Sequence, residues 1–427
     1  MRNGPLDLRI LDNLVVDETT KGLRGAPPVR LREVGAQAWT LRDLQPPAMV
    51  LREPALAHNL RLMADYCADR GVGLAPHGKT TMAPQLWNRQ LAAGAWGITA
   101  ATVQQARVMR ACRVPRILIA NELADEGTLA WVATQLDDPA VELHCQVDSA
   151  DGVALLDDVL RRLTPSRSLG VLVELGHEGG RTGCRTVEDA LDVAARVRRS
   201  QSLRLAGVTA YEGSLGHGRS AERLASVARF LDGVRGFAER LLGAGDIEGD
   251  EMLLSAGGSA FFDVVVERFT APWPAGARVE VLLRSGCYLT HDAGLYERDS
   301  PFSSEPDASR RFDDAIEVFG VVLSRPEPDL AIVGMGRRDV PYDQDLPMPR
   351  TVFNASGREP IAVEGLVQVL QLNDQHAFCR VGPGVRLEVG DLVAFGVSHP
   401  CTAFDKWRVI PVLDADDRVV DAIATFF

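Results

Sequence analysis

The sequence predicts an α/β protein with a (β/α)8 barrel followed by a C-terminal antiparallel β domain. Three observations support this prediction. The chain has 427 residues, which suits a barrel of about 250 residues plus a smaller partner. Helical and strand patterns alternate between about residues 54 and 286. After about residue 300 the helical patterns stop, and short β-rich segments follow, separated by Gly, Pro and Asp.

The barrel prediction comes from eight apolar segments with helical patterns between them. The expected strands lie at 71–79, 97–101, 116–123, 141–149, 170–176, 203–213, 251–259 and 278–286. Apolar residues recur at helical spacing in 54–70, 84–94, 102–112, 125–136, 187–200 and 221–245. Most strand segments are continuous apolar runs, as expected of parallel strands covered on both faces. An open doubly wound sheet is the alternative, and the lack of a G-x-G-x-x-G after the first strand disfavours it.

The pattern divides the chain into three parts. Residues 1–45 form an N-terminal segment that we expect to contribute strands to the β domain, residues 46–295 form the barrel, and residues 296–427 form the β domain. A polar linker, "EPDASRRF", marks the last boundary. Strand-like segments of the β domain occur at 315–325, 330–336, 365–374, 376–381, 391–397 and 407–414.

Composition excludes several classes of protein. Lys and Arg number 46 against 58 Asp and Glu, so the net charge of −12 argues against nucleic acid and against acidic membrane surfaces as partners. No apolar run reaches the roughly 18 residues of a membrane span, and the N-terminus lacks the features of a secretory signal. The seven cysteines are scattered and form no C-x-x-C pair, which indicates reduced thiols. We therefore expect a cytoplasmic protein with a small-molecule partner.

Active sites of such barrels lie at the carboxyl ends of the strands, and polar residues occur there. In "LAPHGKTTMAPQ", Lys79 follows the first strand, and an apolar strand end can hold a lysine in its neutral, nucleophilic form. In "SAGGS", Gly257, Gly258 and Ser259 follow the seventh strand, where barrels often bind phosphate. A phosphate cradle opposite a lone lysine suggests pyridoxal phosphate.

Other strand ends supply candidate partners for this cofactor. Tyr211 could contact the pyridine nitrogen and Arg181 the phenolate oxygen. His77 either contacts the ring or packs in the core. We take Asn121 and Tyr288 as candidate substrate contacts, and His177 lies in the same loop as Arg181.

These motifs resemble the D-serine dehydratase and D-threonine aldolase family, which has the alanine-racemase barrel of fold type III pyridoxal-phosphate enzymes. The segment "PHGKTTMAPQLWNRQLAAGAWGITAATVQQARVM" is similar to the family's P-H-x-K-T motif, and "ANEL", "RTG", "YEG", "SAGGS" and "RSGCY" follow in the family's order. The resemblance implies that Lys79 is the Schiff-base lysine. It also implies a homodimer in which the β domain of one chain closes the barrel mouth of the other. The chain departs from the motif at Ala75, Thr81 and Met82, which leaves the substrate open.

The resemblance further implies a metal site of the form H-x-C or H-x-D in the β domain. Here "SHPC" supplies His399 and Cys401, and a thiolate with an imidazole suits zinc. The cysteine form goes with dehydratases, so the leading expectation is conversion of D-serine to pyruvate and ammonia. A D-threonine aldolase-like lyase, a racemase and a non-catalytic pyridoxal-phosphate-binding protein are the alternatives.

Overall fold

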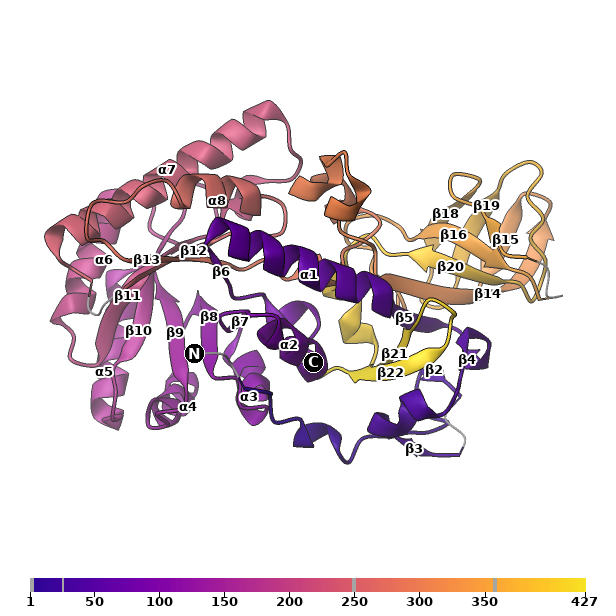
Figure 1. Ribbon diagram of the computed structural model, residues 1–427, viewed down its shortest axis with the longest axis horizontal. Coiled ribbons are helices and arrows are strands. Elements are labelled where there is room, and N and C mark those ends of the chain that lie inside the picture. Colours follow the sequence, from indigo (N-terminus) through magenta and orange to yellow (C-terminus); the bar gives the residue numbers. More distant parts are fainter. Residues whose placement is uncertain (1–3, 25–26, 248–250, 356–358) are drawn as a thin grey trace.

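The computed structural model describes residues 4–24, 27–247, 251–355 and 359–427. Figure 1 shows two lobes: a sheet wrapped by helices, and a β-rich lobe that contains the C-terminal strands. The long helix α1 (Glu53–Arg70) runs from the β-rich lobe towards the barrel. Within the described residues, no helix is both long enough and apolar enough to cross a membrane.

Eight parallel strands form the barrel. Their bounds are β6 (Gly73–Leu74), β7 (Ile98–Ala100), β8 (Arg116–Glu122), β9 (Glu142–Val147), β10 (Leu169–Leu175), β11 (Leu203–Ala210), β12 (Met252–Ala256) and β13 (Val279–Leu283). Neighbours in the sheet follow the chain order from β7 to β13, and β13 pairs with β6. The N–H of Trp96 donates to the oxygen of Leu74 (2.7 Å), and the N–H of Thr99 donates to the oxygen of Pro76 (2.9 Å). These bonds, with an isolated parallel bridge between His77 and Thr99, bring the segments at the two edges of the curled sheet together, and the predicted barrel fold is confirmed.

Helices follow the strands around the outside of the barrel. They are α2 (Pro84–Ala92), α3 (Val103–Ala111), α4 (Glu126–Leu136), α5 (Ala150–Leu163), α6 (Val187–Arg199), α7 (Ala221–Ala244) and α8 (Phe262–Phe269). Five of them begin at a side chain that accepts a hydrogen bond from the first turn: Thr102, Asp125, Ser149, Thr186 and Ser220. Such caps satisfy N–H groups that have no partner inside the helix, and they fix where each helix starts.

The β-rich lobe is built on one ten-stranded sheet. Its strands are β5 (Ala48–Arg52), β14 (Ile316–Glu327), β15 (Leu330–Val333), β16 (Met348–Phe353), β17 (Ile361–Ala362), β18 (Val367–Leu372), β19 (Ala377–Val381), β20 (Leu392–Gly396), β21 (Val409–Leu413) and β22 (Val419–Ala424). Every pairing is antiparallel except that of β5 with β21. A C-terminal antiparallel sheet is therefore confirmed, and it also takes in a strand from before the barrel.

The N-terminal segment meets the β-rich lobe through an isolated antiparallel bridge between Thr40 and Arg418, and its named strands lie outside the large sheet. Its strands are β1 (Val15–Val16), β2 (Gly22–Leu23), β3 (Val29–Arg30) and β4 (Leu44–Gln45), and they pair only with one another, as β1–β3 and β2–β4. The strand that joins the large sheet is β5, which lies just after residue 45. The segment instead packs at the end of the sheet, where the N–H of Val419 donates to the oxygen of Trp39. Residues 1–3 and 25–26 of this segment lie outside the described residues.

Short 3-10 helices from both lobes lie at the barrel mouth. They include η4 (Gly78–Thr80) after β6, η5 (Glu212–Leu215) after β11, η6 (Cys287–Leu289) after β13 and η9 (Pro400–Thr402) after β20. Helix α9 (Leu295–Asp299) lies between the last barrel strand and the β-rich lobe. These turns place residues from both lobes around one cavity.

Candidate active site

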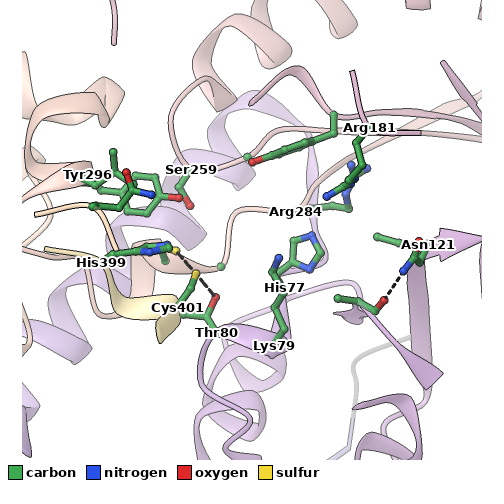
Figure 2. A pocket seen from close by; sticks show the side chains of 18 of the residues that line it. His77, Lys79, Thr80, Asn121, Arg181, Ser259, Arg284, Tyr296, His399 and Cys401 are labelled. Atoms are coloured by element: carbon green, nitrogen blue, oxygen red, sulfur yellow. Dashed lines mark hydrogen bonds between the residues drawn. The ribbon is translucent and has the colours of Figure 1, made fainter. Parts of the chain in front are cut away.

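A cavity of about 350 Å³ lies at the carboxyl ends of the barrel strands. Residues of the β-rich lobe, Gln344, His399 and Cys401, line it from the other side. In Figure 2, His399 and Cys401 lie on one side, with His77, Lys79, Arg181 and Arg284 on the other. Its volume is within the range of small-molecule sites.

Lys79 is the only one of the three lysines of the chain that lines this cavity, and all three are among the described residues. Lys21 is tied elsewhere, with its amine 2.7 Å from a carboxylate oxygen of Asp339. Among the described residues, the amine of Lys79 makes no hydrogen bond or ion pair. The turn that holds it requires a glycine, because a Cβ on Gly78 would lie 2.6 Å from a side-chain carbon of Met109. The amine of Lys79 is therefore available to react, and the turn that carries it is tightly packed.

His77 and Arg284 form the floor of the cavity near Lys79. Burial, and then the charges of Lys79 and Arg284, hold the pKa of His77 well below its usual value, so its ring stays neutral. The guanidinium of Arg284 donates to the hydroxyls of Thr209 (2.9 Å) and Ser255 (2.8 Å). Nδ1 of His77 and Nε of Arg284 are buried and have no hydrogen-bond partner. Since buried polar atoms are seldom left unpaired, these two indicate a polar group that enters the cavity.

Arg181 and Tyr211 lie together on one wall. The guanidinium of Arg181 is 5.4 Å from the centre of the Tyr211 ring, within the range of a cation–π contact. Burial, and then the nearby charge of Glu212, raises the pKa of Tyr211 to about 12, so its hydroxyl remains protonated and can donate. The structure thus brings both predicted ring contacts to the cavity.

The "SAGGS" turn requires a correction to the predicted phosphate cradle. Oε2 of Glu212 accepts from the N–H of Gly257 (3.1 Å), and Oε1 accepts from the N–H of Gly258 (2.7 Å). The two N–H groups that we assigned to phosphate therefore hold a buried carboxylate, and Gly257 does not line the cavity. Gly258 and Ser259 do line it. We could not foresee this from the sequence, because nothing in "YEG" shows that the glutamate turns back to the next strand end.

The predicted metal pair lies across the cavity from the barrel floor. Sγ of Cys401 lies 3.4 Å from the hydroxyl of Thr80, next to Lys79 in the chain, and 3.3 Å from Sγ of Cys287. Nδ1 of His399 lies 2.7 Å from a carboxylate oxygen of Asp343, whose other oxygen accepts from Thr402 (2.7 Å). A carboxylate on one ring nitrogen orients a histidine and leaves the other nitrogen for a metal.

The electrostatics of this pair suit a metal. The hydrogen bond from Cys287, aided by His399, holds the pKa of Cys401 well below its usual value despite burial. Burial lowers the pKa of His399, but hydrogen bonds to Cys401 and Asp343 outweigh burial and raise it to about 9. A thiolate beside an imidazole is a donor set that zinc prefers. Within the described parts of the chain, no three His, Cys, Asp or Glu side chains form a ready-made metal site, so the fit rests on these two ligands.

The two candidate substrate contacts have different outcomes. Asn121 lines the cavity, and its side-chain amide donates to the backbone oxygen of Ala101 (3.1 Å). Tyr288 does not line this cavity: it is 3% exposed, and its hydroxyl accepts from the side chain of Gln90 (3.1 Å). Tyr288 is therefore a core residue, and its assignment to the substrate is wrong. His177 also lies away from the cavity lining, and its ring contacts the hydroxyl of Ser214 (2.9 Å).

Several residues of the site had no role in the sequence prediction. Asp343 and Cys287 contact the metal pair, and Tyr296 meets the His399 ring edge-on, with ring centres 6.3 Å apart. Tyr296 and Gln344 come from "GLYERD" and "YDQD", which carry no motif that points to a site. Only the folding of α9 and the loop before β16 against the barrel mouth brings them there.

Comparison with known proteins agrees with this architecture. Residues 52–260 match the family model "Alanine racemase, N-terminal domain", and residues 315–413 match the model "Putative serine dehydratase domain". D-threonine aldolase from Arthrobacter sp. is 27% identical over 91% of this chain and 92% of its own length. D-threo-3-hydroxyaspartate dehydratase from Delftia sp. (strain HT23) is 30% identical over 41% of this chain and 45% of its own length.

The solved structure of D-threonine aldolase from Filomicrobium marinum has the same fold. It superimposes with a TM-score of 0.76 at 25% identity, covering 91% of this chain and 96% of that one. The two matched domains follow each other in the order that the barrel and the β-rich lobe have in the structure. The chain thus contains an alanine-racemase N-terminal domain followed by a serine dehydratase domain, and its relatives are D-threonine aldolase and D-threo-3-hydroxyaspartate dehydratase, which are fold type III pyridoxal-phosphate enzymes.

Proposed function

We propose that the protein is a pyridoxal-phosphate-dependent, metal-assisted lyase that removes the β-hydroxyl of a D-amino acid, with D-serine as the leading substrate. One observation carries the proposal. A single cavity holds the uncommitted amine of Lys79 on the barrel side and the His399–Cys401 pair on the β-lobe side. The reaction needs both, because one group must take the α-proton while another helps hydroxide to leave.

The unpaired polar atoms of the cavity support a bound cofactor. Lys79 would bind the cofactor's aldehyde, Tyr211 and Arg181 would contact its ring, and Gly258 and Ser259 would lie near its phosphate. His77 and Arg284 would satisfy their buried nitrogens against it. When bound, pyridoxal phosphate accepts the electron pair that is left at Cα.

The chain's own groups supply the remaining chemistry. The amine of Lys79 would take the α-proton, and the neutral ring of His77 would add no further positive charge beside that amine. His399 and Cys401 would hold a divalent metal, zinc by preference, which stabilises negative charge on the departing hydroxyl oxygen. The eliminated enamine would then hydrolyse to an oxo acid and ammonia.

A retro-aldol reaction is the second candidate, and the similarity to D-threonine aldolase over 91% of the chain favours it. The same lysine and metal pair would serve, but the Cα–Cβ bond would break instead of the Cβ–O bond. The cysteine in "SHPC" favours elimination, because the family resemblance associates H-x-C with dehydratases.

Product analysis separates the candidates. Protein supplied with pyridoxal phosphate and zinc is incubated with D-serine, D-threonine and 3-hydroxy-D-aspartate, with the L-isomers as controls. Elimination yields oxo acid and ammonia from the D-isomers alone. Aldehyde and glycine as the main products would establish the second candidate. Cofactor binding without turnover of any D-isomer would refute both, and would leave a non-catalytic pyridoxal-phosphate-binding protein.

A further inference from the structure

Cys287 and Cys401 are the one pair of cysteines in sulfur–sulfur contact, and all seven cysteines belong to the described residues. Their sulfur atoms lie 3.3 Å apart, although 114 positions separate them in the chain. Cys287 begins η6, after the last barrel strand, and Cys401 lies in η9 of the β-rich lobe. Since a disulfide bond is about 2.05 Å long, the two sulfurs would need to approach by roughly 1.2 Å.

Both thiols are reachable from the cavity. Cys287, although buried, and Cys401 both line it, whereas the other five cysteines, also buried, do not. A small oxidant that enters the cavity would therefore meet these two sulfurs first. The hydroxyl of Thr80 lies 3.4 Å from Sγ of Cys401 and 4.0 Å from Sγ of Cys287, so one residue contacts both thiols.

We propose that Cys287 and Cys401 are an oxidative modification site, at which a peroxide or a small disulfide links them into a reversible disulfide. With hydrogen peroxide, the sulfur of Cys401 attacks one oxygen, the O–O bond breaks, and a sulfenic acid and water form. The sulfur of Cys287 then attacks the sulfenic sulfur, the S–O bond breaks, and the thiol proton leaves with the oxygen as water. In sum, two thiols lose two electrons and two protons, and one peroxide becomes two waters.

The bond would have two consequences for the site. It would join the barrel covalently to the β-rich lobe at the cavity wall, because Cys287 lies in η6 after the last barrel strand and Cys401 lies in η9 of the β-rich lobe. It would also remove the thiolate of Cys401, so the oxidised protein could not use that residue for a metal. This second consequence rests on the proposed function, whereas the disulfide itself needs neither metal nor cofactor.

The test measures thiols and their linkage, with no need for activity. Reduced full-length protein, stripped of metal by a chelator, is treated with hydrogen peroxide or with glutathione disulfide, and then unfolded for thiol titration. The count should fall from seven to five, and peptide mapping should find Cys287 joined to Cys401. Dithiothreitol should restore seven. Cys287→Ser should not form the link, whereas Cys379→Ala, which alters a buried cysteine in β19, should lose two thiols as the wild type does.

A second arm tests the coupling to metal. Loading the reduced wild type with zinc before oxidation should slow the loss of the two thiols by at least tenfold, since a bound thiolate is shielded. If the metal-free wild type keeps both thiols, or if Cys401 links to another cysteine, the proposal is wrong. If the link forms at the same rate with zinc present and zinc does not bind, the disulfide proposal stands and the metal assignment in the proposed function fails.

Discussion

Replacing Asp343 should weaken zinc binding without touching either metal ligand. Oδ2 of Asp343 lies 2.7 Å from Nδ1 of His399, and Oδ1 accepts from the hydroxyl of Thr402. Without this carboxylate, the imidazole can rotate and can present either nitrogen to the metal. Outer partners of this kind contribute about 10- to 100-fold in metal affinity, which corresponds to about 1.4 to 2.8 kcal/mol.

The exposure of the carboxylate decides where in that range the effect should fall. The side chain of Asp343 is 39% exposed, so water can replace part of the lost contact. We therefore expect Asp343→Asn, which keeps an oxygen acceptor, to weaken zinc binding about tenfold, and Asp343→Ala to weaken it by up to about 100-fold.

Competition with a chromophoric chelator at pH 7.5 measures this affinity directly. Asp345→Asn is the matched control, because Asp345 is a nearby carboxylate whose side chain pairs with Arg298 (2.6 Å) and not with His399. The control should bind zinc as the wild type does. Wild-type affinity in Asp343→Ala would refute the idea that this carboxylate orients His399 as a metal ligand.

Three further predictions test other parts of the site. Zinc binding at pH 7.5 should release about one proton, because the pKa of His399 is raised to about 9 and its proton must leave, whereas Cys401 is already a thiolate. The zinc affinity should rise about tenfold per pH unit from pH 7 and level off near pH 9. Calorimetry in two buffers that shows release of two protons or of none would contradict this. Glu212→Gln should weaken pyridoxal-phosphate binding about tenfold, because the two carboxylate oxygens of Glu212 accept from the N–H groups of Gly257 and Gly258, and the amide has an NH₂ group in place of one of these oxygens. An unchanged cofactor affinity in fluorescence titration would show that the turn does not position the cofactor. Sedimentation at micromolar concentration should show a homodimer, and a fully active monomer would exclude a site shared between chains.

Most of the barrel could be predicted because its strands carry their signal locally. Apolar runs such as 170–176 and 203–213 predict buried parallel strands, and the ends of β10 and β11 lie within three residues of the ends of those runs. The β-rich lobe was less predictable. Strand β16 contains Pro349 and directly follows Pro347, and β5 joins the large sheet only because distant strands β14 and β21 flank it.

The site residues likewise fall into those that a local sequence pattern marks and those that only the fold brings together. Lys79 and the His399–Cys401 pair could be found because strand ends and an H-x-C spacing mark them. Glu212, Asp343 and Cys287 could not, because each acts through a partner that is distant in the sequence, such as the 56 positions between Asp343 and His399. Tyr288 was wrongly assigned because position after a strand does not fix the direction of a side chain, and this one turns into the core.

The central claim, that Lys79 binds the cofactor, has a direct test because the chain has only the lysines Lys21, Lys79 and Lys406. Protein loaded with pyridoxal phosphate is reduced with borohydride, digested and mapped by mass spectrometry. We expect the pyridoxyl label on Lys79 alone, near-visible absorption in the wild type and in Lys406→Ala, and loss of both signals in Lys79→Ala. A label on Lys21 or Lys406 with Lys79 unmodified, or a borohydride-reducible cofactor bond that persists in Lys79→Ala, would contradict the account.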